Sequence, residues 1–226
     1  MNTTAWPCPA LGGTGEEFAL VAGPSDAAAS VLIVPALFEE ANRTRRMLVE
    51  TMRALAKAGI ASVLPDLPGC NESLAPLDAQ DLAGWRAALV ASVDHFAATH
   101  VLSLRGGVVV APQSLPGWQF EPIAGAQVLR PMLRARTVTA REERRTETMD
   151  GLLEHGRNAG IELAGYRIGA ALVRDLTAAT LPELSPQSVV NLEDLGGTAL
   201  WLRSEPGEDA DLSTALAARI VADLTR

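Results

Sequence analysis

The sequence is poor in the residues that build metal centres and disulfide frameworks. Its 226 residues include two cysteines and three histidines. Cys8 and Cys70 lie far apart and lack the close spacing of metal ligands, so the sequence predicts neither a zinc site nor a disulfide framework. We therefore expect two reduced thiols and no metal or other cofactor.

The sequence also lacks a long apolar run and an excess of basic residues. No apolar stretch approaches the ~18 residues that cross a bilayer, and the segment MNTTAWPCPALGGTGEEF has no basic start or apolar core of a signal peptide. The formal net charge of −8 disfavours nucleic acid and anionic membranes as partners. These absences predict a cytoplasmic protein without a membrane span or a nucleic-acid partner.

What is present is enough apolar sequence for one sizeable domain. Because 48% of the 226 residues are apolar, we expect a single domain over residues 1–226. Apolar runs typical of buried strands occupy residues 17–23, 30–38, 60–69 and 100–104, with helical spacing between them at 43–59 and 81–96. This alternation predicts a doubly wound, mostly parallel α/β sheet.

The sequence beyond Pro112 departs from this alternation. A strand at residues 118–125 precedes an arginine-rich helical region at 127–156, in which REERRTE alternates acid and base and favours a solvated helix face. Residues 161–179 are typical of a hairpin followed by a helix. We expect residues 123–180 to form a helical cap inserted into the domain.

The C-terminal part predicts one more strand and one more helix. TALWLRS, residues 198–204, has the apolar content of a strand, and it is the last such segment that we expect. A final helix over residues 211–226 is predicted to begin at Asp211 or Ser213, which are good N-cap residues.

Four separated blocks of this sequence resemble one family. They are PALFEEANRTRRM, LPDLPGCNES, WQFEPIAGAQVLRPMLRAR and LAGYRI, in that order along the chain. Together they resemble the type 2 exosortase A system-associated hydrolases, a branch of the α/β-hydrolase superfamily from bacteria that export exopolysaccharide. The resemblance runs from about Phe18 to about Leu202. It implies an α/β-hydrolase-like fold and a small-molecule or protein partner in an exopolysaccharide or protein-sorting system.

The resemblance also gives a context to HVLSLRGG, residues 100–107. In an α/β hydrolase, a pattern of the form small-x-nucleophile-x-small follows the central strand. Ser103 and Gly107 occupy the small positions here, and Arg105 occupies the place of the nucleophile. A guanidinium stays protonated near neutral pH and cannot act as an acyl-transfer nucleophile. The resemblance therefore implies the fold of a hydrolase more than its chemistry.

The remaining members of a catalytic triad are also missing from their usual places. His95 and His100 precede the elbow, and His155 falls in the expected cap. A triad histidine normally follows the last strand, and the chain ends after the predicted final helix, so the last strand of the superfamily is expected to be absent. Three carboxylates stand near the expected position of the triad acid without a histidine to orient: Glu205, Glu208 and Asp209.

Two kinds of site remain open. As a ligand site we single out Arg105, Glu39 and Asn42, because a guanidinium binds carboxylate or phosphate bidentately and strand ends meet at one edge of an α/β sheet. The structural alternative is that Arg105 pairs with Asp66 or Glu39. For Glu40 and Arg45, we favour ion pairing within the structure over ligand binding.

As unconventional nucleophiles, Cys70 and Ser103 lie near strand ends, with His155 as a conceivable base. Two functional hypotheses follow. The first is a non-hydrolytic binding protein, a pseudoenzyme, for an anionic small molecule or a partner. The second is an ester or thioester hydrolase with one of these nucleophiles. A homodimer that completes the site is a further possibility, because a truncated sheet leaves an edge to be covered.

Overall fold

A mostly parallel seven-stranded sheet forms the centre of the protein, in the order β1-β2-β4-β3-β5-β6-β9. The computed structural model describes residues 1–10, 13–182 and 186–225. The strands are β1 (Asn2–Ala10), β2 (Gly13–Ala22), β3 (Ser30–Val34), β4 (Ala61–Pro65), β5 (His100–Leu104), β6 (Gly117–Phe120) and β9 (Gln187–Val190). The strands β4, β3, β5, β6 and β9 run parallel, as the sequence predicts for a doubly wound sheet.

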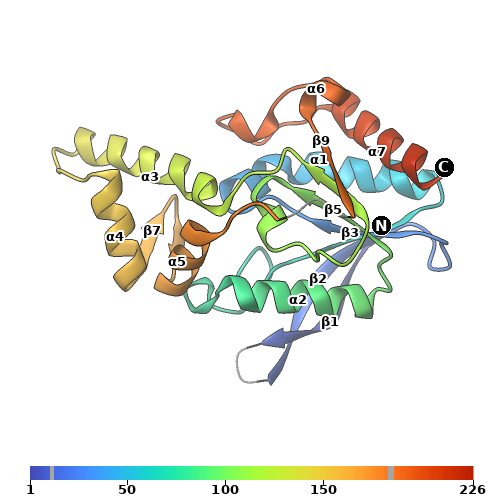
Figure 1. The fold of residues 1–226 in the computed structure, drawn as a ribbon, viewed down its shortest axis with the longest axis horizontal. Coiled ribbons are helices and arrows are strands. Elements are labelled where there is room, and N and C mark those ends of the chain that lie inside the picture. The colour runs from blue at the N-terminus through green and yellow to red at the C-terminus, as the bar shows by residue number, and fades with distance from the viewer. Residues whose placement is uncertain (11–12, 183–185, 226) are drawn as a thin grey trace.

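Helices cover both faces of this sheet (Figure 1). One face carries α1 (Glu39–Lys57) and α7 (Ala210–Leu224), which pack against each other, and the other carries α2 (Leu82–His95). Each face has its own apolar core. The central strands are therefore covered on both sides, which explains why their sequences are continuous apolar runs. No helix in the described ranges is long and apolar enough to cross a membrane.

The N-terminal edge of the sheet is an antiparallel hairpin that the sequence predicts only in part. The apolar pattern of residues 17–23 predicts β2, whereas β1 lies in the Pro/Gly-rich N-terminal segment, for which the sequence predicts no strand. Trp6 and Cys8 of β1 point into the core, while Pro7 and Pro9 alternate with them. Prolines on an edge strand block further pairing, and they also hide the strand from a search based on propensity.

A helical insertion separates β6 from β9 (Figure 1). It contains α3 (Gly125–Glu142), α4 (Met149–Ala159), the two-stranded sheet of β7 (Ile161–Leu163) and β8 (Tyr166–Ile168), and α5 (Ala170–Ala178). The arginine-rich region is therefore two helices, and the expected hairpin followed by a helix is present. The assignment of residues 123–180 as a cap or lid of the domain stays a prediction.

The prediction of the last strand is wrong. TALWLRS forms the short 3-10 helix η3 (Leu200–Leu202), and the seventh strand is β9, whose four residues QSVV are too short and polar to stand out in the sequence. The apolar side chains of Leu200 and Trp201 belong to the core between the sheet and the helices α1 and α7. No further strand follows β9 in the described part of the chain, whose last element is α7. That helix begins at Ala210, and its N-cap is Asp209 instead of the expected Asp211 or Ser213.

Candidate functional site

Arg105 stands at a sharp turn between β5 and the 3-10 helix η2 (Arg105–Val109). Its φ of 48° is left-handed, which a residue other than glycine adopts only under constraint. The turn is tightly packed, since a Cβ built on Gly107 would stand 2.1 Å from the carbonyl oxygen of Pro35. The small residue that the elbow pattern predicts at this position is therefore required by the approach of the β3 end.

The guanidinium of Arg105 is held by three groups. Its Nε and Nη2 donate to the two carboxylate oxygens of Glu40 at 3.0 and 3.2 Å, and its Nη1 donates to the carbonyl oxygen of Glu121 at 3.3 Å. Trp201 covers its face, with Cζ 4.6 Å from the ring centroid. The Arg105 and Glu40 side chains are 12% and 14% exposed, so this bidentate pair is mostly shielded from water.

The partner of Arg105 differs from the sequence expectation. Neither Asp66 nor Glu39 contacts it; Glu40, in the first turn of α1, does. An i,i+4 pair instead joins Glu39 to Arg43, and Arg45 lies 3.6 Å from Asp66. The pairing expected for Glu40 and Arg45 is thus present. Sequence alone could not assign the partner of Arg105, because Glu39 and Glu40 lie about 100° apart around α1 and only the fold decides which one faces β5.

The second ligand candidate, Asn42, connects α1 to the insertion. Its Nδ2 donates to the hydroxyl of Tyr166 on β8 at 3.0 Å, and Tyr166 packs edge-on against Phe38. Burial raises the pKa of Tyr166, and Cys70 and Glu39 raise it further, so the hydroxyl stays protonated near neutral pH. Tyr166 is a site residue that the sequence analysis missed; its place in the LAGYRI block was the available signal.

Arg43 completes this polar cluster. Its Nη1 donates to the carbonyl oxygen of Trp201 at 3.0 Å, so η3 is tied to α1 as well as to Arg105. Arg105, Arg43, Asn42 and the Tyr166 hydroxyl together place several donors at the carboxyl end of the sheet. Ligands of open α/β sheets bind at this edge.

Cys70 lies in a loop with buried polar neighbours. Burial raises its pKa to about 12, and the carboxylates of Asp66 and Glu17 act in the same direction. Asp66 accepts from Asn71 at 2.7 Å, and Glu17 accepts from Ser73 at 2.7 Å, which fixes the loop. A thiol with this pKa is almost entirely protonated at neutral pH, which opposes a role for Cys70 as nucleophile.

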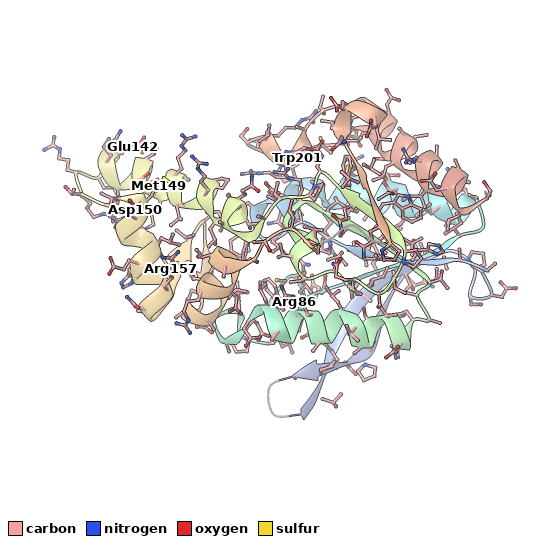
Figure 2. All side chains as sticks on the ribbon, in the orientation of Figure 1. Arg86, Glu142, Met149, Asp150, Arg157 and Trp201 are labelled. Atoms are coloured by element: carbon pink, nitrogen blue, oxygen red, sulfur yellow. The ribbon has the colours of Figure 1, made fainter. Side chains whose placement is uncertain are left out.

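Ser103 and His155 are not brought together. Ser103 is fully buried within β5, and its hydroxyl lies 3.5 Å from the carbonyl oxygen of Trp118. His155 is on α4, where it borders a hollow of about 440 Å³ with Arg136 and Asp78. Figure 2 labels Asp150 and Arg157, which flank His155 in sequence, far from Trp201. None of Arg105, Glu40 and Trp201 lines the hollow beside His155, so the fold does not bring His155 to the Arg105 site.

Because β9 takes the place of the strand expected at residues 198–204, the position where a triad acid would stand is directly after Val190, at the end of β9. The residues after this strand are Asn191 and α6 (Leu192–Leu195), so Glu205, Glu208 and Asp209 lie beyond it. Asp194 instead accepts from the backbone N–H of Asn191 at 2.9 Å. Glu208 pairs with Arg46, and Asp209 caps α7. Glu208 and Asp209 thus each have a structural partner, whereas Glu205 is exposed and has no ion-pair partner among the described residues.

In the part of the chain that the structure describes, neither a metal-binding cluster nor a hollow beside η2 includes Arg105. Within the described residues, no group of three or more His, Cys, Asp or Glu side chains could hold a metal ion. A hollow of about 690 Å³ lies between α2 and η2, beside Arg86, whose Nε and Nη2 donate to the carbonyl oxygen of Val109. It borders η2, but Arg105 and its partners do not line it.

Three observations identify the fold: the strand order, the left-handed conformation of Arg105 directly after β5, and Gly107, which has no room for a side chain. This is the α/β-hydrolase fold. The structure is similar to Est1E from Butyrivibrio proteoclasticus, solved with ferulic acid bound, at 11% identity and a TM-score of 0.60, covering 93% of this chain and 96% of that one. A thermophilic esterase from Thermogutta terrifontis, solved with malate bound, is similar at 14% identity and a TM-score of 0.55, covering 100% and 97%.

The tetrameric haloalkane dehalogenase DpaA from Paraglaciecola agarilytica is similar at 11% identity and a TM-score of 0.55, covering 97% and 92%. No family model matches the sequence, and no curated protein matches it either. Likeness at these identities shows the α/β-hydrolase fold alone, because one fold supports many functions.

Proposed function

We propose that this chain is a non-hydrolytic binding protein on an α/β-hydrolase scaffold. The observation that carries the proposal is Arg105, which stands at the elbow in the strained conformation of a nucleophile yet is paired with Glu40. Strain of this kind is retained where the surrounding structure over-determines it. The elbow here holds a positive charge and a set of donors instead of a nucleophile.

The proposed ligand carries a carboxylate or a phosphate. One anionic group replaces the Glu40 carboxylate on the guanidinium of Arg105, and Asn42 and Tyr166 supply further donors beside it. Released Glu40 remains in the first turn of α1, where the positive end of the helix dipole stabilises a carboxylate. The helix dipole therefore offsets part of the cost of releasing Glu40 from this ion pair.

The resemblance of the four sequence blocks supports a place in an exopolysaccharide or protein-sorting system. The two free thiols, Cys8 and Cys70, fit a reducing compartment, so the proposal includes a cytoplasmic location. The alternative, an ester or thioester hydrolase, needs Cys70 or Ser103 as nucleophile. The raised pKa of Cys70 and the burial of Ser103 both weigh against it.

Intact-mass labelling separates these two functions. The purified protein is treated with a fluorophosphonate and, separately, with a thiol-directed acylating probe, and turnover of short acyl esters and thioesters is measured in parallel. We expect no stoichiometric label and no turnover. Stoichiometric labelling at one residue, with turnover abolished by Cys70→Ala or Ser103→Ala, would establish the hydrolase instead.

Ligand binding is tested separately, with inorganic phosphate and succinate as probes. We expect either probe to raise the melting temperature of the wild type, and the Arg105→Met variant to lose this shift. The Arg53→Met variant is the matched control, because Arg53 forms an exposed pair with Glu50 on the same protein. An equal shift in the Arg105→Met variant would overturn the anion site.

A further inference from the structure

One face of α3 carries arginines without acidic partners. Arg130, Arg134 and Arg141 are exposed, and no carboxylate in the described residues pairs with them. Their spacing of four and seven residues places them within about 40° of one another around the helix, along about 16 Å of its length. Val138, on the same face, is 50% exposed. We call these four residues the basic ridge.

The basic ridge belongs to an otherwise acidic molecule. Residues 125–145 contain six arginines and two glutamates, a net +4, whereas the whole chain carries −8, so the remaining residues carry −12. Of its two glutamates, Glu143 pairs with Arg145, and Glu142 forms no ion pair with the ridge among the described residues. Glu147, just beyond this region, pairs with Arg145 and Arg136. A DNA duplex or an anionic membrane would face the excess negative charge of the other surfaces.

The chain also provides a surface of opposite charge. Residues 191–211 hold six acids and one arginine, a net −5. Glu193, Glu205 and Asp211 are exposed there, without a cationic partner in the part of the chain that is described. Leu202, between them in sequence, is 77% exposed. We call Glu193, Leu202, Glu205 and Asp211 the acidic patch.

The two surfaces match each other in kind. Each combines unpaired charges of one sign with one exposed aliphatic side chain, and protein interfaces commonly combine apolar residues with a polar rim. In Figure 1, α3 and the stretch from α6 to α7 both lie along the upper border of the molecule. If a two-fold axis passes between them, each ridge meets the acidic patch of the other copy, and the contact is closed and isologous.

From this complementarity we infer that the chain forms a two-fold homodimer in which the basic ridge of one copy contacts the acidic patch of the other. The contact adjoins the candidate site, because Leu202 follows Trp201, which covers Arg105. The inference does not depend on the ligand proposed above. It predicts a dimer whose partner covers the η3 side of the Arg105 site.

Sedimentation velocity tests the inference through charge reversal. The ridge variant carries Arg130→Glu, Arg134→Glu and Arg141→Glu, and the patch variant carries Glu193→Lys, Glu205→Lys and Asp211→Lys. We expect the wild type to be a dimer at low salt, with dissociation promoted by salt, and each variant alone to be a monomer. Mixed in equal amounts, the two variants should form a dimer again, because both contacts of the mixed pair join opposite charges.

A matched control carries Arg53→Glu, Lys57→Glu and Arg167→Glu, which make the same charge change outside the ridge; it should remain a dimer. Circular dichroism verifies that each variant is folded. A wild type that is monomeric at low salt, or a mixture that fails to reassociate, would overturn the inference. A monomer that instead binds phosphatidylserine vesicles through the ridge would assign this surface to lipid and equally overturn the dimer.

Discussion

At the scale of single residues, the ion pair of Arg105 and Glu40 has the clearest consequence for stability. Removing one member leaves the other charge shielded from water and unpaired, so Glu40→Gln should lower the free energy of unfolding by about 3 kcal/mol. The double variant Arg105→Met with Glu40→Gln should recover most of this loss. Urea denaturation monitored by tryptophan fluorescence measures both.

The exposed pair of Arg53 and Glu50 is the control for this effect. Glu50→Gln should change the free energy of unfolding by less than about 0.5 kcal/mol, because water already solvates both charges. If Glu40→Gln were equally harmless, Arg105 would be held mainly by Trp201 and the Glu121 carbonyl. The pair would then be open to exchange with solvent ions.

Glu17 is a second residue with a predictable effect. It is 5% exposed, its Oε2 has no hydrogen-bond partner, and burial raises its pKa above the ordinary 4.5, while the hydrogen bond from Ser73 lowers it. The folded state therefore holds the proton more tightly than the unfolded state. Its contribution to stability is complete below pH 4.5 and is lost as the pH rises through the raised pKa.

Glu17→Gln should consequently stabilise the protein at mildly alkaline pH by about 1 kcal/mol, because the amide still accepts from Ser73 and carries no charge. Thermal unfolding across a pH series measures this, and the stability of the variant should depend less on pH. Glu16→Gln is the control, since Glu16 is the exposed neighbour on the same strand. A variant that is less stable than the wild type at alkaline pH would show that Glu17 is charged and paired.

At the scale of elements, the start of α7 depends on one side chain. Asp209 accepts from the backbone N–H groups of Leu212 and Thr198 and from the Thr198 hydroxyl, at 3.0, 2.9 and 3.0 Å. Asp209→Ala should lower the free energy of unfolding by about 1 kcal/mol, as for other N-caps. Chemical denaturation measures the loss, and Asp211→Ala, without a side-chain partner in the same turn, should be nearly neutral.

The pH dependence of this cap follows from the same contacts. The backbone hydrogen bond from Leu212 is the main cause that lowers the pKa of Asp209 below its ordinary 3.8. The stabilisation is therefore present above pH 3.8 and is lost as the pH falls through the lowered pKa. The difference between wild type and Asp209→Ala should shrink in strong acid, and a constant difference would contradict the role of the charge.

Elements were predictable where local periodicity was strong. The strand and helix patterns over residues 30–104 predicted β3, α1, β4, α2 and β5, because a covered parallel sheet requires apolar strands and amphipathic helices. β1 and β9 were missed, since Pro7, Pro9 and the polar start of QSVV hide their extended conformation. η3 was mistaken for a strand because Leu200 and Trp201 are buried by helices, and burial alone does not distinguish these elements.

At the scale of the whole molecule, the fold suppresses the chemistry of its two thiols. Burial raises the pKa of both Cys8 and Cys70 to about 12, from an ordinary 9.0. At mildly alkaline pH the thiolate fraction should therefore be roughly 1000-fold lower in the folded protein than in the unfolded chain. Alkylation by iodoacetamide, followed by intact mass with and without urea, should show a difference of that order. Rapid alkylation of Cys70 in the folded protein would revive the hypothesis of a thiol nucleophile.

The sequence by itself determined the alternation of strands and helices, the small residues of the elbow, and the presence of an arginine where a nucleophile would stand. These features are local, since each depends on neighbours within a few residues. Tertiary structure alone decided that Arg105 binds Glu40, 65 residues away, that Tyr166 reaches Asn42, and that Cys70 is protonated. Such outcomes depend on which buried groups meet across the fold, because water is excluded there and each charge must find its partner.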